Sequence, residues 1–252
     1  MTRRRWLLTA VILVGLLIVG AGLEIYTRLP NVDRLPVLDM PPDAQVVALV
    51  IHGSYDGNDP LLPEIVFALG KRYAAEPAAV VRLIRWAPAS DDRLRAAANA
   101  RVIGAALGEQ LARVKSLREL RLVAHSVGAA MPDAICASYR AHSSRPARVE
   151  MEFLDPFQIA GFFDWSWGSR HYGECADFAL SVLNTDDNAP ATNRPLQNAF
   201  NIDVTAHPGR VAFTAGGHRW PLAYYRDFMA RSPGPAARSH ELEPRGTVVP
   251  AD

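Results

Sequence analysis

The stretch that most constrains the fold lies at residues 120–128, which read LRLVAHSVG. Apolar, β-prone residues stop abruptly at His-Ser-x-Gly, a pattern typical of a strand that turns sharply into a helix, with the serine on the turn. Such a turn presents its serine as a nucleophile, so Ser126 is the first candidate for a catalytic residue. Position 124 is Ala where the usual pattern has Gly, and a methyl group there crowds the turn.

Length and composition favour a single domain without affinity for nucleic acids. The chain has 252 residues, of which 49% are hydrophobic and 21% charged. This suits one α/β domain with a sizeable core better than two domains. The formal net charge is +1, and the arginines form no basic stripe interleaved with aromatic residues. We therefore expect no nucleic-acid partner.

The two cysteines, Cys136 and Cys175, form no CxxC pair and have no histidine nearby at ligand spacing. A structural zinc is therefore not expected. A disulfide is possible if the domain is exported. Two buried free thiols are the interpretation that we favour.

The N-terminal segment, residues 1–24, differs in composition from the rest. Arginines at positions 3–5 precede an uncharged run, residues 6–23, which Glu24 closes. At ~1.5 Å per residue the run is ~27 Å long, close to the ~30 Å hydrocarbon core of a bilayer. We predict a single-pass anchor in the cell inner membrane with the domain on the extracytoplasmic side. A cleaved signal peptide and secretion are the alternative, because the small residues at 20–22 resemble a cleavage site.

The rest of the chain divides into a linker, a domain and a tail. Residues 25–44 contain four prolines and several charges, which is typical of a linker. Residues 232–252 are rich in Pro, Arg and Glu without periodicity, so we expect a disordered tail. Between them, residues 45–231 alternate strands and helices. We expect strands at 46–51, 80–86, 120–124, 148–154, 178–185 and 199–204, and helices at 61–73, 93–115 and 127–139.

This alternation of apolar strands with helices predicts an α/β fold, with a mostly parallel central sheet and helices on both faces. Pro132 lies deep in the helix expected after Ser126 and is expected to kink it.

Two backbone amides are candidates for an oxyanion hole. The helix after Ser126 directs its free N–H groups at an anion, so the amide of Val127 is one donor. The second donor is expected in the loop after an earlier strand. The strand at 46–51 is followed at once by His-Gly-Ser, which makes the amide of Ser54 the natural second donor, with His52 bracing the loop. The alternative is an ordinary glycine turn.

A serine nucleophile also needs a base and an acid. In this type of fold the order along the chain is Ser, acid, His. His218 follows two glycines in a loop after the last strand, which makes it the best-placed base. Asp155 ends one strand, and Asp186 and Asp187 follow the next. Either position can hold the imidazole and stabilise its cation, and spacing alone does not choose between them.

In these motifs the chain resembles the pancreatic-type lipase family of α/β-hydrolases, over about residues 47–228. The similar segments, in order, are HGSYDG, IRWAP with NARVIGAALGEQL, AHSVGA, FLDP, ADFALSVLNTDDNAP and HRWPLAYYRDF. The resemblance implies the α/β-hydrolase fold and makes Asp155 the triad acid, with Asp186 the alternative. It also supports Ser54 and Val127 as oxyanion donors.

Two further segments bear on the substrate. The interval 207–217 is too short for the lid helix of that family, so we expect little activation by lipid interfaces, and lipid docking would depend on the N-terminal anchor. Six aromatic residues gather in residues 157–172. They suit a wall that holds an acyl chain, or ordinary core packing. Tyr224 and Tyr225 are expected to pack beside the histidine loop.

Together these features predict a serine ester hydrolase, of the lipase or carboxylesterase kind, with Ser126, Asp155 and His218 as its triad. It would act on acyl esters or lipids and need no metal or organic cofactor. Phospholipase A1 and thioesterase activity are alternatives, because the same triad serves all three. A non-catalytic binding or scaffold domain is an alternative of another class. The oligomeric state, the physiological substrate and its acyl length are not indicated.

Overall fold

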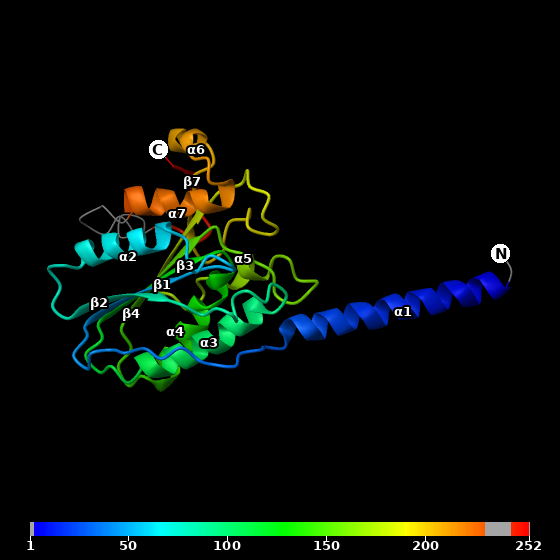
Figure 1. Cartoon of the computed structure of the whole chain (residues 1–252), viewed down its shortest axis with the longest axis horizontal. Coiled ribbons are helices and arrows are strands. Elements are labelled where there is room, and N and C mark those ends of the chain that lie inside the picture. The colour runs from blue at the N-terminus through cyan, green and yellow to red at the C-terminus, as the bar shows by residue number, and fades with distance from the viewer. Residues whose placement is uncertain (1–2, 230–242, 252) are drawn as a thin grey trace.

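A computed structural model describes residues 3–229 and 243–251 of the chain (Figure 1). The centre of the domain is a seven-stranded sheet in the order β2-β1-β3-β4-β5-β6-β7. Every pair of neighbouring strands in it is parallel. The predicted α/β class with a mostly parallel sheet is confirmed.

The elements follow the predicted alternation, with small shifts at their ends. The strands are β1 (Val46–Ile51), β2 (Ala79–Ile84), β3 (Glu119–His125), β4 (Arg148–Leu154), β5 (Phe178–Leu183), β6 (Phe200–Asp203) and β7 (Val248–Pro250). The longer helices are α1 (Arg3–Arg28), α2 (Leu61–Arg72), α3 (Ala96–Leu111) and α4 (Pro132–His142). Short helical segments are η1 (Ser126–Ala130), α5 (Trp167–His171), α6 (Pro208–Ala212), η2 (Gly217–Arg219), α7 (Trp220–Tyr224) and η3 (Tyr225–Met229).

The sheet is buried on both faces, which explains the nearly continuous apolar sequence of its central strands. All six residues of β1 are buried. Helices α3 and α4 cover one face, and α2 and α7 cover the other (Figure 1). Helices α3 and α4 pack closely because glycines face the contact. A methyl group at Gly104 would lie 2.7 Å from the carbonyl oxygen of Met131.

The segment after Ser126 is divided by its proline. A 3₁₀ helix, η1, runs to Ala130, and the regular helix α4 begins at Pro132. A proline at the first position of a helix lacks only an N–H that would have no partner there. The expected kink within one continuous helix is therefore wrong, because Pro132 starts the second helix.

The N-terminal helix and the linker are both joined to the domain. Helix α1 continues to Arg28, beyond the predicted end at residue 24. The linker then lies along α3: the amide of Asn31 donates to Oδ1 of Asn99 at 2.6 Å, and the amide of Leu38 donates to Oε1 of Gln110 at 2.8 Å. Residues 25–44 thus bind the domain instead of forming a free tether.

The disordered tail predicted at residues 232–252 is wrong in its last part. Val248–Pro250 forms β7, an edge strand that pairs with β6. The two valines suit a strand, and a proline is tolerated at a sheet edge. Residues 230–242 and residue 252 lie outside the described residues.

Cys136 of α4 and Cys175 form a disulfide. The free thiols that we favoured from the sequence are therefore wrong. Asp133, one turn before Cys136, accepts hydrogen bonds from the amides of Gly173 and Cys175 at 2.9 and 3.0 Å. These bonds hold the segment after α5 against α4 and bring the two cysteines together.

Candidate active site

Ser126 lies on a strained turn at the carboxyl end of β3. Its φ is +54°, a left-handed conformation that a serine rarely adopts. This conformation is typical of a nucleophile at a strand-to-helix turn. Ala124 stays within β3, fully buried and paired with Ile51 and Phe153, so its methyl group is accommodated without loss of the turn.

Two glycines bring the loop after β1 against this turn. A methyl group at Gly128 would lie 2.6 Å from the carbonyl oxygen of His52. One at Gly53 would lie 2.7 Å from Cβ and 3.2 Å from Oγ of Ser126. Any larger residue at either position would push the loop away, so these glycines set the distance between the loop and the serine.

His52 braces this loop, as predicted. The indole Nε1 of Trp86 donates to the carbonyl oxygen of His52 at 2.9 Å, and the amide of Trp86 approaches His52 Nε2 at 3.3 Å. The hydroxyl of Ser54 donates to the carbonyl oxygen of Ser90 at 2.6 Å. The loop that carries the amide of Ser54 is therefore tied to the segment after β2.

His218 and Asp155, which are 63 residues apart in sequence, meet at the same edge of the sheet. Nδ1 of His218 lies 2.5 Å from Oδ2 of Asp155. Asp155 follows β4 directly, is fully buried and has a φ of +44°. Its Oδ1 also accepts a hydrogen bond from the amide of Asn184 at 3.1 Å. The amide of Phe157, two residues on, donates to the carbonyl oxygen of Ser126 at 3.0 Å.

The alternative acid, Asp186, does not contact His218. It pairs with Arg210 at 3.0 Å, and 43% of its side chain is exposed. Its neighbour Asp187, to which the sequence analysis gave no separate role, is nearly buried and lies 3.7 Å from Nδ1 of His218. The structure thus places two carboxylates, Asp155 and Asp187, beside one imidazole.

The two carboxylates shift the protonation of this group. Burial by itself would lower the pKa of His218, but Asp155 and Asp187 outweigh it and raise this pKa to about 9. Burial raises the pKa of Asp155, and its neighbour Asp187 adds to that shift. Burial opposes the change at Asp187, yet His218 and Asp155 hold the pKa of Asp187 below its usual value. The group therefore favours a protonated imidazole at neutral pH.

The loop that carries His218 packs against three other segments. Nε2 of His125, the residue before the candidate nucleophile, lies 3.0 Å from the carbonyl oxygen of His218. Arg219 forms a two-point ion pair with Asp59 at 2.6 and 2.7 Å, which ties the loop to the start of α2. A methyl group at Gly217 would lie 2.7 Å from Cβ of Asp187, so the loop also packs closely on the acidic segment.

Asp56 is a residue at the site that the sequence analysis did not single out. Its Oδ2 lies 3.0 Å from Nδ1 of His125. Burial would raise the pKa of Asp56, but the neighbouring imidazoles, His125 first, hold it below its usual value. The aspartate of the HGSYDG segment was the available signal, but nothing in its spacing predicted a contact with His125.

The two tyrosines expected beside the histidine loop have structural contacts. Tyr225 is fully buried, and its hydroxyl donates to Glu152 of β4. Tyr224 packs edge-on against His207, with ring centres 5.3 Å apart. The interval between β6 and His218 contains α6, a helix of five residues.

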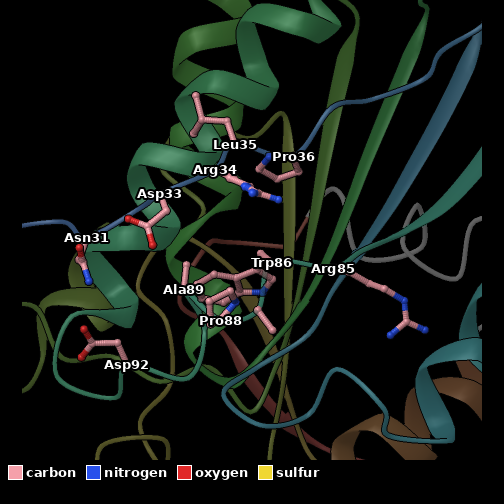
Figure 2. Close-up of a pocket in the computed structure, with 11 residues that line it drawn as sticks. Asn31, Asp33, Arg34, Leu35, Pro36, Arg85, Trp86, Pro88, Ala89 and Asp92 are labelled. Carbon is pink, nitrogen blue, oxygen red and sulfur yellow. The ribbon is translucent and has the colours of Figure 1, made fainter.

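A cavity of about 650 Å³ lies between the linker and the segment after β2 (Figure 2). Trp86 lies at its centre, and Arg85 extends away from the other labelled side chains and donates to the carbonyl oxygen of Gly57 at 2.6 Å. Ser126, Asp155 and His218 do not line it. The cavity is therefore separate from the candidate triad.

A second cavity, of about 170 Å³, is likewise not lined by Ser126, Asp155 or His218. It lies between the end of α1, the segment leading into α3 and the loop of residues 157–165, which we call the aromatic loop. Phe157, at the start of this loop, is the residue whose amide donates to Ser126. The apolar lining includes Leu94, Ala97, Phe157, Ile159, Phe162 and Trp165. The aromatic residues of segment 157–172 do not all line this cavity. Tyr172 lies in the core, stacked on Phe153.

One ligand atom each from Asp155, Asp187 and His218 lies within 4.8 Å of the other two. Two carboxylates and an imidazole at this spacing also match the ligand set of a cation site. In this structure the same atoms face one another in the hydrogen bond and the ion pair described above.

Comparisons with known proteins add a structural likeness. No protein-family model and no curated protein matches the sequence. Among the solved structures that match is lipase B from Aspergillus fumigatus, with 10% identity and a TM-score of 0.37. The match covers 67% of this chain and 46% of that one, so it spans less than half of that lipase. The fold assignment therefore rests on the parallel sheet and on the turn at Ser126. The chain has an α/β-hydrolase fold.

Proposed function

We propose that this protein is a serine ester hydrolase in which Ser126 is the nucleophile, His218 the general base and Asp155 the residue that orients the base. The observation that carries this proposal is the 2.5 Å contact between His218 Nδ1 and buried Asp155. It occurs at the sheet edge where Ser126 lies on a strained turn. An imidazole held at Nδ1 has its Nε2 free to take a proton from a serine hydroxyl.

The reaction then follows from the roles of these residues. Ser126 Oγ attacks the ester carbonyl while His218 takes its proton. His218 gives that proton to the leaving alcohol, and Asp155 stabilises the imidazolium that forms in between. Water, activated by the same histidine, releases the acyl group from Ser126.

The negative charge of the tetrahedral intermediate needs donors that are already in place. The amides of Val127 and Ser54 are the proposed pair, each supplying ~3 kcal/mol of transition-state stabilisation. Their support is the close approach of the loop after β1 to Ser126, which Gly53 and Gly128 permit.

The leaving group distinguishes the related activities. A triglyceride or simple ester, a phospholipid and an acyl thioester would all suit this triad, and relative rates on the three substrates separate lipase, phospholipase A1 and thioesterase. A scaffold domain without catalysis would hydrolyse none of them. The paired His218 and Asp155 favour catalysis, because a binding domain has no need for that contact.

A fluorophosphonate probe tests the nucleophile directly. We expect the probe to label the full-length protein once, on the peptide that contains Ser126, and to abolish hydrolysis of a soluble short-chain ester in proportion. Ser126→Ala should prevent labelling, whereas Ser143→Ala, at the end of α4, should not. Mass spectrometry of the labelled peptide gives the position. Full labelling of Ser126→Ala would contradict the mechanism.

The pH dependence tests the role of His218. Catalysis needs the neutral imidazole, so kcat/KM for a soluble ester should rise with pH, with a midpoint near the pKa of about 9 that its two carboxylates impose. Asp187→Asn removes one negative charge beside the imidazole, so the midpoint should move toward the ordinary value of ~6.5. Asp186→Asn, away from His218, is the matched control. An unchanged midpoint in Asp187→Asn would refute this electrostatic coupling.

A further inference from the structure

The aromatic loop is bound to the end of the apolar helix α1. Oε2 of Glu24 accepts hydrogen bonds from the amides of Phe162 and Phe163 at 2.6 and 3.1 Å. Gly161, with a φ of +74°, lies so close that a methyl group there would overlap the Glu24 carboxylate. The loop and the helix therefore form one structural unit.

Other contacts fix the direction of the helix relative to the domain. The guanidinium of Arg95 lies 4.6 Å from the ring centre of Tyr26. Thr27 is buried, and it lines the 170 Å³ cavity together with Phe157 of the aromatic loop. In contrast, the apolar window of α1 is not buried in the domain, and the helix projects away from it (Figure 1).

The aromatic loop lies level with the apolar part of α1. A methyl group at Gly20 would lie 3.1 Å from Cζ of Phe163. Gly20 is three residues before Leu23, the last residue of the uncharged run, which is ~4.5 Å along a helix. If α1 spans a bilayer, the ring of Phe163 lies just inside the boundary between headgroups and hydrocarbon.

The side chains at that level are exposed and aromatic. Phe162, Phe163 and Trp165 are 39%, 62% and 51% exposed. Neighbouring exposed aromatic rings are costly in water, but they are typical of the belt at a membrane surface. Leu94, 54% exposed, adds to the same patch beside the cavity.

We propose that the aromatic loop inserts into the bilayer beside α1, and that the substrate is a bilayer lipid whose acyl chain enters the 170 Å³ cavity from the membrane side. The cavity is smaller than the ~300–1,000 Å³ of typical small-molecule sites, which suits part of one acyl chain. Its lining links the domain to α1: Phe157, whose amide donates to the carbonyl oxygen of Ser126 at 3.0 Å, lines it, and so does Thr27 of α1. The substrate part of this inference rests on the proposed esterase function.

The inference also requires that α1 stays attached to the domain. Cleavage after the small residues at 20–22 would remove Gly20, which contacts Phe163, and would leave Glu24 at a free chain end. The contacts of Glu24, Tyr26 and Thr27 with the domain therefore favour an uncleaved anchor over a signal peptide.

Fluorescence quenching tests the insertion without any need for activity. The full-length Ser126→Ala protein is reconstituted in vesicles that contain phosphatidylcholine brominated near the carbonyl end of its acyl chains. Bromine should quench the tryptophan fluorescence of the Ser126→Ala protein more than that of the Ser126→Ala, Trp165→Phe protein. Only the Ser126→Ala protein has an indole in the aromatic loop at that depth. Equal quenching of the two proteins would overturn the insertion.

Kinetics test the route of the substrate. Phe163→Ser, at a residue outside the cavity lining, should lower hydrolysis of a long-chain ester lipid in vesicles by about tenfold. It should leave hydrolysis of a soluble short-chain ester within about twofold, since membrane contact plays no part there. Phe67→Ser, at an exposed phenylalanine of α2 on the opposite side of the domain from α1, is the matched control and should change neither rate.

The outcomes separate this inference from the proposed function. If wild type hydrolyses neither ester, the esterase function fails, while the quenching result still decides whether the loop inserts. If Phe163→Ser lowers both rates equally, or neither, entry from the membrane side is overturned although the esterase function stands. Crosslinking measures whether Trp165→Phe changes the oligomeric state. If the two proteins differ in quenching only because of such a change, a second copy of the chain occupies this surface and the inference is overturned.

Discussion

Asp155→Asn is expected to lower kcat on a soluble ester by about 10⁴-fold, the loss seen when the corresponding aspartate of serine proteases becomes asparagine. Asparagine keeps the shape and tolerates the left-handed backbone at this position, where φ is +44°. Its amide would donate to Nδ1 of His218, so the imidazole would hold the wrong tautomer, with its proton on the nitrogen that must accept from Ser126.

Asp186→Asn is the matched control for that experiment. Asp186 is the other acid that spacing allowed, but it pairs with Arg210 and does not contact His218. We expect a change of only a few-fold. Circular dichroism should show that both variants fold. A large loss of kcat in Asp186→Asn together with a small loss in Asp155→Asn would show that Asp186, and not Asp155, is the triad acid.

Removal of the disulfide is expected to cost about 3–4 kcal/mol of unfolding free energy. Cys136 and Cys175 are 39 residues apart in sequence, and a crosslink over a loop of that size restricts the unfolded chain by roughly this amount. For a domain of this size the melting temperature should fall by about 10 °C in the Cys136→Ala, Cys175→Ala double variant. Thermal unfolding of the full chain in detergent, followed by circular dichroism, measures the change.

Reductant provides the control for the disulfide. It should lower the melting temperature of wild type to about that of the double variant and leave the double variant unchanged. Two titratable thiols in unreduced, unfolded wild type, with no effect of reductant, would contradict the disulfide. A bridge that persists in the cell also agrees with the extracytoplasmic location expected from the arginines at positions 3–5.

Local sequence patterns predicted most of the fold. The hydrophobic pattern predicted the ends of β1, β3 and β4 to within one residue, because buried parallel strands are continuous apolar runs. The turn at Ser126 was predictable for a similar reason: a strand, a small-residue turn and a helix occupy consecutive positions. The edge strand β7 was missed because three residues with a proline form no recognisable period.

Contacts between distant segments were not predictable in this way. The two cysteines carry no signal of pairing in their spacing, and Asp133 brings them together through bonds to the backbone of another segment. In the sequence, Glu24 likewise marks only the end of an apolar run. Only the folded chain places its carboxylate under the amides of Phe162 and Phe163.

By itself, the sequence determined the α/β class, the strained turn at Ser126 and an apolar N-terminal helix long enough to span a bilayer, since each depends on neighbouring residues. Spacing left the acid open and the family resemblance pointed to Asp155. The tertiary structure places Asp155 against His218, and it adds Asp187 beside the same imidazole. Asp155 directly follows β4, and Asp187 lies in the loop after β5, the neighbouring strand in the sheet. Their distances from His218 depend on how the histidine loop packs over that edge, which residue spacing does not encode.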